Sequence, residues 1–147
     1  MSCILVVDPM ARRRTEVVAL LSQTGYDVIT APHGREAMEK LEHAAADLVL
    51  LELPMPVMDG LAFLEYLRSD PRWDNLPVIV FTELSDGPSI RQARQLGANK
   101  YLVRWQATSA DLLRHIQHHL QPQIGPWAIN AFGNSLAGHQ HRPMLHR

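Results

Sequence analysis

Residues 48–60 read Leu48-Val49-Leu50-Leu51-Glu52-Leu53-Pro54-Met55-Pro56-Val57-Met58-Asp59-Gly60. This segment opens with a continuous apolar run, reaches an acid at Glu52 and continues into a loop rich in proline and methionine. A short apolar run without alternation is typical of a strand that is buried on both faces of a parallel sheet. Four further runs have the same character, at 4–7, 28–30, 78–81 and 101–103.

Segments with the helical spacing of apolar residues separate these five runs. Val17, Leu20 and Leu21 recur at i, i+3 and i+4 in the first segment, and four later segments have a similar pattern. Gly25 and Gly97 each follow such a segment, where the residue after a helix favours positive φ. Strands that alternate with helices predict right-handed crossovers and an open parallel sheet covered on both faces. The sequence therefore predicts an α/β fold of the (βα)5 type.

The composition is that of an ordinary globular chain. Of the 147 residues, 46% are hydrophobic and 20% are charged, which supports a real core. The formal net charge of −1 gives no general attraction to nucleic acid or anionic lipid. The single cysteine, Cys3, excludes an internal disulfide framework, and no apolar stretch approaches the ~18 residues that a membrane span requires. We therefore expect a soluble, cytoplasmic protein that binds neither nucleic acid nor membranes.

The chain changes character after residue 120. The segment 121–147 is rich in Gly, Pro, Asn and His, and it is too short to form a second domain. We predict one domain over 1–120 and a C-terminal tail over 121–147. The tail is expected to be flexible or to dock through apolar residues such as Trp127 and Phe132.

Polar side chains follow four of the five apolar runs. Asp8 follows the first run, Glu52 the third, Thr82 the fourth and Arg104 the fifth. Because ligands of open parallel sheets bind at the carboxyl ends of the strands, these four side chains predict a pocket at one edge of the sheet. The sequence holds neither a P-loop nor a GxGxxG motif, so we do not expect an enzyme.

These motifs closely resemble the response-regulator receiver family of bacterial two-component signalling. The resemblance lies in the run that ends at Asp8, in the segment 48–60 and in shorter matches, and it extends in order from residue 3 to about residue 120. It implies a flavodoxin-like, doubly wound parallel sheet with strand order 2-1-3-4-5. It also implies that a histidine kinase donates a phosphoryl group to an aspartate after the third strand. Mg²⁺ would assist, held by that aspartate and by two acids after the first strand.

Three pocket positions depart from the family's pattern. Glu52 stands at the phosphoacceptor position, where its extra methylene displaces the carboxylate by about 1 Å or more. Pro9 replaces the second Mg²⁺-binding acid, and Arg104 replaces the lysine that binds the phosphoryl group. Thr82 matches the family's hydroxyl position. We therefore expect no catalytic residue, no metal site and no cofactor, with Mg²⁺ binding that is weak at most.

The resemblance and its departures predict a stand-alone, atypical receiver that acts in signal transduction by phosphorylation-independent protein contact. Glu52 and Arg104 are expected to form a bidentate pair that holds Thr82 and Tyr101, the family's switch aromatic, in an active-like arrangement. A second interpretation stays open, in which this pair is only a structural ion pair that fills a pocket without phosphoryl chemistry. The alternative function is a divergent receiver that still accepts a phosphoryl group from a histidine kinase with Mg²⁺.

The expected partners are signalling proteins, either a histidine kinase or another regulator, and a homodimer through the last two helices and the fifth strand is a further candidate. The surface residues considered there are Arg91, Gln95, Tyr101, Asp111 and Arg114. The three arginines at 12–14 are expected to form a solvated helix face. His115, His118 and His119 have helical spacing, but no cysteine or acidic ligand completes a zinc set.

Overall fold

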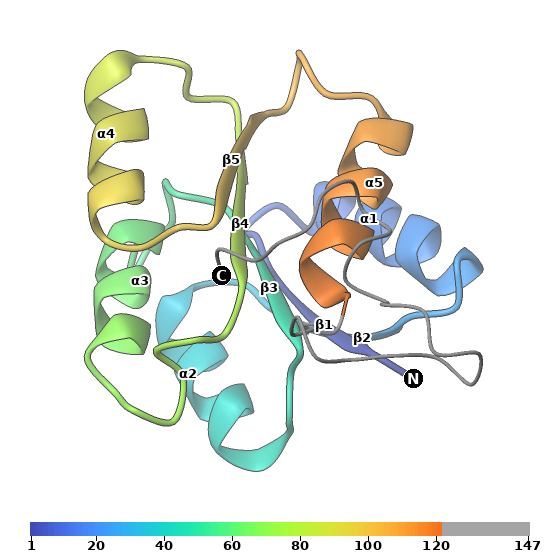
Figure 1. The fold of residues 1–147 in the computed structure, drawn as a ribbon, viewed down its shortest axis with the longest axis horizontal. Coiled ribbons are helices and arrows are strands. Elements are labelled where there is room, and N and C mark those ends of the chain that lie inside the picture. Colours follow the sequence, from blue (N-terminus) through green and yellow to red (C-terminus); the bar gives the residue numbers. More distant parts are fainter. Residues whose placement is uncertain (122–147) are drawn as a thin grey trace, which may run out of the picture.

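The computed structural model describes residues 1–121, which form a parallel sheet flanked by helices (Figure 1). The strands are β1 (Cys3–Val7), β2 (Asp27–Ala31), β3 (Leu48–Leu51), β4 (Val78–Thr82) and β5 (Lys100–Val103). The helices are α1 (Ala11–Gln23), α2 (Gly34–His43), α3 (Gly60–Arg68), α4 (Gly87–Gln95) and α5 (Ser109–Leu120). The strand order is β2-β1-β3-β4-β5, and all neighbouring strands are parallel. The predicted flavodoxin-like (βα)5 fold and its strand order are confirmed.

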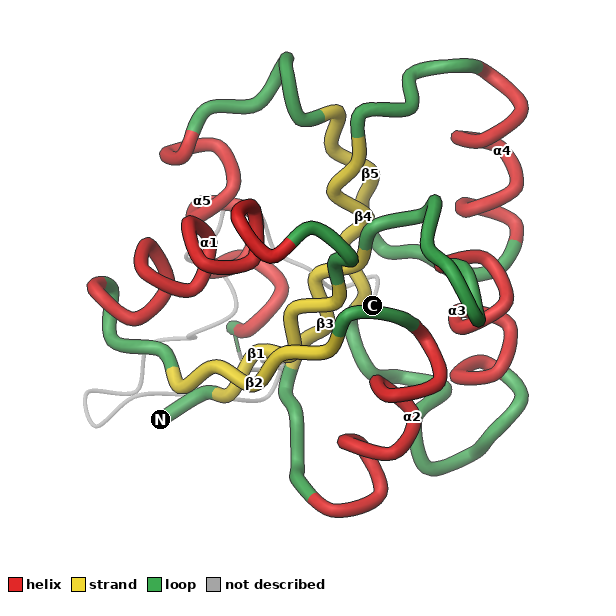
Figure 2. The backbone as a smooth tube through the Cα atoms, turned by 180° about the vertical axis from the view of Figure 1, so that it is seen from behind, coloured by secondary structure: helices red, strands yellow, loops and turns green. Residues whose placement is uncertain are grey.

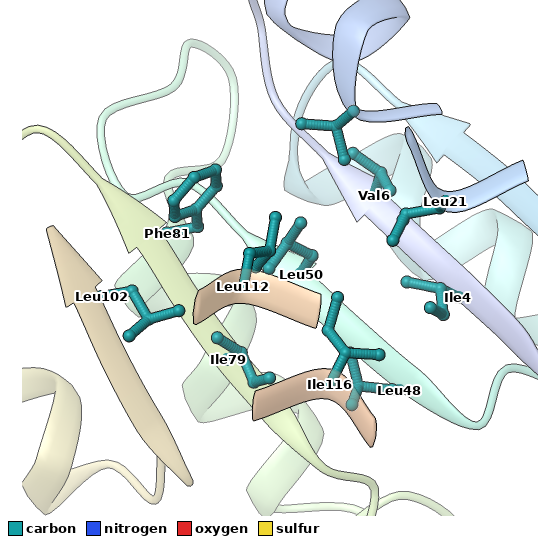
Figure 3. Packing of buried hydrophobic residues seen from close by; sticks show 11 residues of the cluster. Ile4, Val6, Leu21, Leu48, Leu50, Ile79, Phe81, Leu102, Leu112 and Ile116 are labelled. Atoms are coloured by element: carbon teal, nitrogen blue, oxygen red, sulfur yellow. The ribbon is translucent and has the colours of Figure 1, made fainter. Parts of the chain in front are cut away.

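Different helices cover the two faces of the sheet. α1 and α5 pack on one face, whereas α2, α3 and α4 pack on the other (Figures 1 and 2). Side chains alternate along β1, so Ile4 and Val6 contribute to the core under α1 and α5, and Leu5 and Val7 to the core under α2 and α3. Figure 3 shows the first of these cores, with Leu112 of α5 packed among the strand residues. Burial on both faces explains why the strand segments are continuously apolar.

Local signals fix the ends of the helices. Gly25 and Gly97 have φ angles of 92° and 99°, the conformation that glycine adopts without steric cost. Asp59 and Asp86 cap α3 and α4, each accepting a hydrogen bond from a backbone N–H of the first turn. Thr108 opens a capping box at α5. Side-chain caps and glycines with positive φ therefore define where these helices begin and end.

Backbone pairing continues one residue beyond the strands at this edge. The Asp8 N–H donates to the last carbonyl of β2 at 3.1 Å, and the Glu52 N–H donates to the last carbonyl of β1 at 3.0 Å. The Arg104 N–H donates to the Thr82 carbonyl at 2.7 Å. These bonds fix the backbone from which the candidate site residues project.

Within residues 1–121, no helix combines the length and the apolar character needed to cross a bilayer. The predicted tail, with Trp127 and Phe132, lies outside the described residues apart from Gln121.

Candidate functional site

Two acidic side chains are buried at the carboxyl edge of the sheet. Asp8 follows β1 and Glu52 follows β3, and they are only 2% and 3% exposed. Thr82, the last residue of β4, is fully buried, and Arg104 follows β5. The structure thus brings together the four pocket residues that the sequence predicts, because β1, β3, β4 and β5 are successive neighbours in the sheet.

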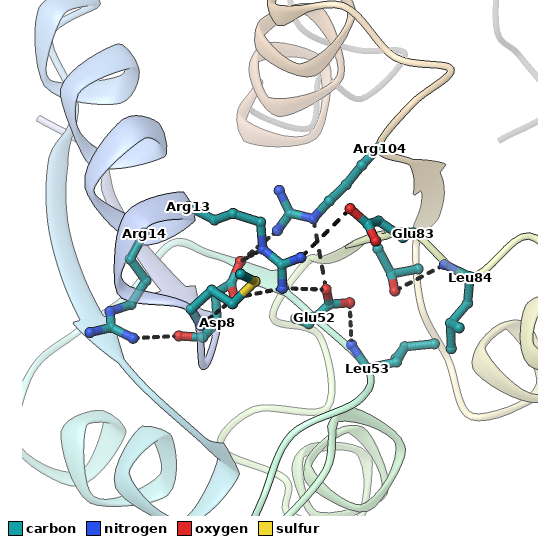
Figure 4. A network of polar contacts seen from close by, with 10 residues as sticks. Asp8, Arg13, Arg14, Glu52, Leu53, Glu83, Leu84 and Arg104 are labelled. Carbon is teal, nitrogen blue, oxygen red and sulfur yellow. Dashed lines mark hydrogen bonds and ion pairs between the residues drawn. The ribbon is translucent and has the colours of Figure 1, made fainter.

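Each of the two carboxylate oxygens of Asp8 accepts two hydrogen bonds (Figure 4). Oδ1 accepts from the Met10 N–H at 2.9 Å and from Arg13 Nη2 at 3.0 Å. Oδ2 accepts from Arg13 Nε at 3.1 Å and from Arg104 Nη2 at 2.6 Å. Two guanidinium groups therefore share one carboxylate, through charge-assisted bonds of the strong class.

Glu52 is held mainly by Arg13 and by the backbone N–H of the next residue, Leu53. Its Oε1 accepts from the Leu53 N–H at 2.8 Å, and its Oε2 accepts from Arg13 Nη2 at 3.0 Å. Arg104 Nε lies 3.7 Å from Oε2, close enough for an ion pair but too far for a hydrogen bond. Arg13 Nη2 therefore bridges the two buried carboxylates.

Asp8, Glu52, Arg13 and Arg104 form a cluster with two negative and two positive charges, hereafter the pocket cluster. Burial raises the pKa of Glu52, and this effect is opposed by the Thr82 hydroxyl, a backbone N–H and both guanidinium groups. Burial lowers the pKa of Arg104, although Asp8 and Glu52 oppose that shift. The hydrogen bond to Asp8 raises the pKa of Arg13. The charges of the cluster thus compensate one another inside the protein.

The predicted bidentate pair between Glu52 and Arg104 is wrong. Arg104 donates to Asp8 instead, and its guanidinium carbon lies 4.2 Å from the centre of the Phe81 ring. Its buried Nε has no hydrogen-bond partner within the described residues. Stacking on Phe81 and the short bond to Asp8 together hold the guanidinium group beyond hydrogen-bond reach of Glu52.

The prediction of a solvated face at 12–14 is also wrong for Arg13 and Arg14, and Arg14 Nη1 donates to the Asp8 carbonyl oxygen at 2.7 Å. The Arg13 side chain is 20% exposed, whereas that of Arg12 is 86% exposed. α1 begins three residues after Asp8, so its first turn lies over the pocket and Arg13 reaches both acids. A sequence signal was available, because a cation in the first turn of a helix opposes the macrodipole and gains from an acidic partner.

The backbone of Leu84 connects Thr82 with Tyr101. The Leu84 N–H donates to Thr82 Oγ1 at 3.3 Å, and the Tyr101 hydroxyl donates to the Leu84 carbonyl at 2.8 Å. Burial raises the pKa of Tyr101, so its hydroxyl remains protonated and able to donate at neutral pH. The loop after β4 is therefore tied both to the pocket and to β5.

The loop after Glu52 depends on Gly60. A Cβ atom at Gly60 would overlap the Glu52 carbonyl oxygen and would lie 2.8 Å from Leu53 Cα, a backbone atom that cannot move aside cheaply. The Gly60 N–H also donates to the Leu53 carbonyl at 2.8 Å. Asp59 caps α3, as described above. Both residues therefore act structurally, by setting the path of the chain beside the pocket.

The residues of the pocket do not fit Mg²⁺. This ion requires near-octahedral oxygen ligands, and all four carboxylate oxygens of Asp8 and Glu52 already accept hydrogen bonds from the chain itself. Pro9 offers no carboxylate, and Arg13 and Arg104 already supply two positive charges. Across residues 1–121, no three His, Cys, Asp or Glu side chains are grouped as a metal site.

Comparisons with known proteins agree with this fold. The family model for the response regulator receiver domain matches residues 4–117. Chemotaxis protein CheY1 of Helicobacter pylori is 38% identical over 103 residues, which cover 69% of this chain and 83% of that protein. The probable transcriptional regulator ycf27 of Porphyridium aerugineum is 38% identical over 101 residues, which cover 69% of this chain and 41% of that protein.

Solved structures show the same similarity. Chemotaxis protein CheY4 of Vibrio cholerae has a TM-score of 0.76 and 30% identity, over 82% of this chain and 99% of that chain. The BeF3-activated receiver domain of RstA from Klebsiella pneumoniae has a TM-score of 0.76 and 27% identity, over 82% of this chain and 100% of that chain. The chain therefore belongs to the response regulator receiver domain family of two-component signalling.

Proposed function

We propose that this receiver domain is a pseudo-receiver, which acts by binding a signalling protein and does not accept a phosphoryl group. One observation carries the proposal: Arg13 Nη2 lies 3.0 Å from both Asp8 Oδ1 and Glu52 Oε2. This guanidinium group places a permanent positive charge between the two carboxylates. Glu52 then occupies the phosphoacceptor position without serving as an acceptor.

The geometry of Glu52 supports this proposal. An attacking carboxylate oxygen must approach phosphorus in line, at about 3–3.5 Å. Both oxygens of Glu52 instead accept hydrogen bonds, from the Leu53 N–H and from Arg13. Freeing one of them would leave a buried charge without its partner, which is costly.

The charge of Glu52 is proposed to set a binding surface through the Leu84 link. Glu52 lies beside the Thr82 hydroxyl, which accepts from the Leu84 N–H, and the Leu84 carbonyl in turn accepts from Tyr101. Tyr101 lines the hollow between α4, β5 and α5. A fixed charge in the pocket would hold this tyrosine in one position, without any modification of the chain.

Receiver domains interact with histidine kinases and with other regulators, and we propose a partner of this kind in the cytoplasm. A second copy of the chain, paired through α4, β5 and α5, is the competing candidate. Sedimentation velocity of the purified chain separates the two, because a homodimer forms without any added protein.

The first test is incubation of the full chain with Mg²⁺ and acetyl phosphate, followed by intact-mass measurement. The mass is expected to stay unchanged, while a receiver with an aspartate acceptor gains one phosphoryl group under the same conditions. A gain of one phosphoryl group that disappears in Glu52→Ala would overturn the proposal in favour of a working, divergent receiver.

The second test compares the wild type with Glu52→Gln, a variant that removes the charge and keeps the shape. Once a partner is in hand, its affinity is measured for both proteins without a phosphodonor. A weaker complex with Glu52→Gln is the expected result. Equal affinities would contradict the proposed role of the Glu52 charge.

A further inference from the structure

A hollow lies between α1 and the start of α5, two helices that lie side by side on the same face of the sheet (Figures 1 and 2). Its volume is about 200 Å³, and it is hereafter the α1–α5 hollow. The residues that α1 contributes have the spacing i, i+3, i+4 and i+7, which places them on one face of the helix. They are Arg13, Glu16, Val17 and Leu20.

The floor of the α1–α5 hollow is apolar. Val17, Phe81 and Leu112 are at most 9% exposed, and Leu20 packs against the same core. An apolar space of about 150 Å³ inside a protein can hold a molecule of the size of benzene. The hollow is smaller than the sites of about 300–1,000 Å³ that hold drug-sized ligands. It therefore has room for one aromatic ring or a short aliphatic chain.

Two arginines of the pocket cluster, Arg13 and Arg104, also line this hollow. Asp8 accepts hydrogen bonds from Nε and Nη2 of Arg13 and from Nη2 of Arg104. Within residues 1–121, Nη1 of neither arginine makes a hydrogen bond, although Arg13 Nη1 lies 3.8 Å from the exposed Glu83. Figure 4 shows Arg104 Nη1 pointing away from both buried acids. The chain thus leaves charged donors unused beside an apolar space.

Arg104 is the least satisfied charge of the pocket cluster. Its side chain is 14% exposed, and its single hydrogen bond within the described residues is the one to Asp8. Its Nε is buried without a partner there. A buried donor that lacks an acceptor is costly, and charge-assisted bonds to a guanidinium group are strong. A further carboxylate beside Nη1 would therefore be favourable for this side chain.

We infer that the α1–α5 hollow binds a small monocarboxylate with an apolar body, an aromatic or short-chain acid. Its carboxylate accepts a hydrogen bond from Arg104 Nη1, and its body packs against the apolar floor. The inference goes beyond the proposed function and does not depend on it. A single negative charge fits better than two, because Asp8 and Glu52 already balance the charges of both arginines.

One acid opposes this ligand. Glu16 is the only acidic side chain that lines the hollow within the described part of the chain, and it pairs with Arg12 at 3.8 Å. The Glu16 side chain is 69% exposed, so water and salt screen its charge. Its repulsion is therefore expected to weaken binding only slightly, and this effect provides a test.

The test is a ¹H–¹⁵N NMR titration of the full chain with benzoate, without Mg²⁺ or a phosphodonor. The amides of Val17, Ala107 and Ser109 belong to residues that line the hollow, and saturable shifts are expected there. We expect a dissociation constant of about 1 mM or lower, which a ligand of this size can reach. No saturation of these shifts by about 20 mM would overturn the inference.

Two comparison ligands separate the charge from the apolar body. Benzamide keeps the ring without the charge, and acetate keeps the charge without the ring. Each is expected to bind at least about tenfold more weakly than benzoate, because each lacks one of the two complementary features. An affinity of either ligand equal to that of benzoate would overturn the inference.

Removal of the opposing acid tests the location of the site. Glu16→Gln is expected to tighten benzoate binding by about twofold to threefold, since it removes a like charge from the lining. The matched control is Glu39→Gln, the same change at an exposed position of α2, on the other face of the sheet. It is expected to bind benzoate like the wild type. Equal affinities of the two variants would overturn the inference.

Two further variants test the floor and the proposed donor. Ala107→Leu places a larger side chain in the lining and is expected to weaken benzoate binding by about tenfold. Arg104→Gln is expected to bring the affinity for benzoate down to that for benzamide. Circular dichroism confirms that both variants are folded, and should either unfold, Glu16→Gln still decides. Unchanged benzoate affinity in a folded variant would overturn the inference.

Failure here would leave the pseudo-receiver proposal intact, because neither a phosphodonor nor a protein partner takes part in these titrations.

Discussion

Arg13 and Glu52 are 39 residues apart in the chain, and Arg13 Nη2 lies 3.0 Å from Glu52 Oε2. The same nitrogen lies 3.0 Å from Asp8 Oδ1. One side chain from the first turn of α1 thus joins the carboxyl ends of β1 and β3. This contact neutralises the pocket from within and is the basis of the proposed loss of phosphoryl chemistry.

Replacement of Arg13 tests whether this bridge stabilises the fold. Arg13→Gln is expected to lower the free energy of unfolding by about 1–3 kcal/mol, because two buried carboxylates lose a charged donor. The neighbouring change Arg12→Gln is the matched control, since Arg12 is exposed and pairs with Glu16 only at 3.8 Å. It is expected to stay within about 0.5 kcal/mol of the wild type. Urea denaturation measures the free energy of unfolding of both variants. Equal decreases would contradict a stabilising role for the Arg13 bridge.

The ionisation of Glu52 is expected to leave a signature in the pH dependence of stability. Its pKa in the folded protein lies above the ordinary value of 4.5, so the unfolded chain releases this proton at a lower pH than the folded chain does. The contribution of Glu52 to the free energy of unfolding is therefore present below pH 4.5 and falls as the pH rises through the folded pKa. Glu52→Gln has no such proton to lose.

The stability of Glu52→Gln relative to the wild type should accordingly increase with pH across this window. Denaturation curves of both proteins on either side of it provide the measurement. The opposite result is that the free energy of unfolding of the wild type increases relative to that of the variant as the pH rises. It would mean that Arg13 and Arg104 depress the pKa of Glu52 more strongly than burial raises it.

The sequence was sufficient to predict the sheet, and it was less informative about the pocket. Continuous apolar runs predict the strands because burial on both faces requires them, and Gly25 and Gly97 predict the ends of two helices because they allow positive φ. The strand order, in contrast, was implied by the resemblance to the receiver family. The pairing of charges depends on side-chain packing instead. Arg104 stacks on Phe81 and bonds to Asp8, and this arrangement cannot be read from the spacing of these residues in the chain.

The contacts of Arg13 were likewise not predictable from the sequence. A run of three arginines is usually a solvated face, and Arg12 behaves in this way. Only the placement of α1 over the carboxyl edge distinguishes Arg13 from its neighbour, and that placement is a property of the folded chain.

Restoration of a divalent-cation site is expected to require the removal of Arg13. Pro9→Asp, Glu52→Asp and Arg104→Lys together replace the three departures from the family's pattern, but they leave Arg13 between the acids. Adding Arg13→Ala to these three changes is expected to raise Mg²⁺ affinity by about tenfold or more, because a positive charge leaves the site. Calorimetric titration compares the two variants, and equal affinities would show that Arg13 does not control the site.

The most direct test of the central claim is a ¹H–¹⁵N NMR titration of the full chain with Mg²⁺ and beryllofluoride, a mimic of the phosphoryl group. The amides of Met10, Leu53 and Leu84 donate to the pocket side chains of Asp8, Glu52 and Thr82, and they report on any ligand there. Signals from these three amides that stay in place at saturating additions are the predicted result. Saturable shifts of all three, lost in Glu52→Ala, would contradict the account.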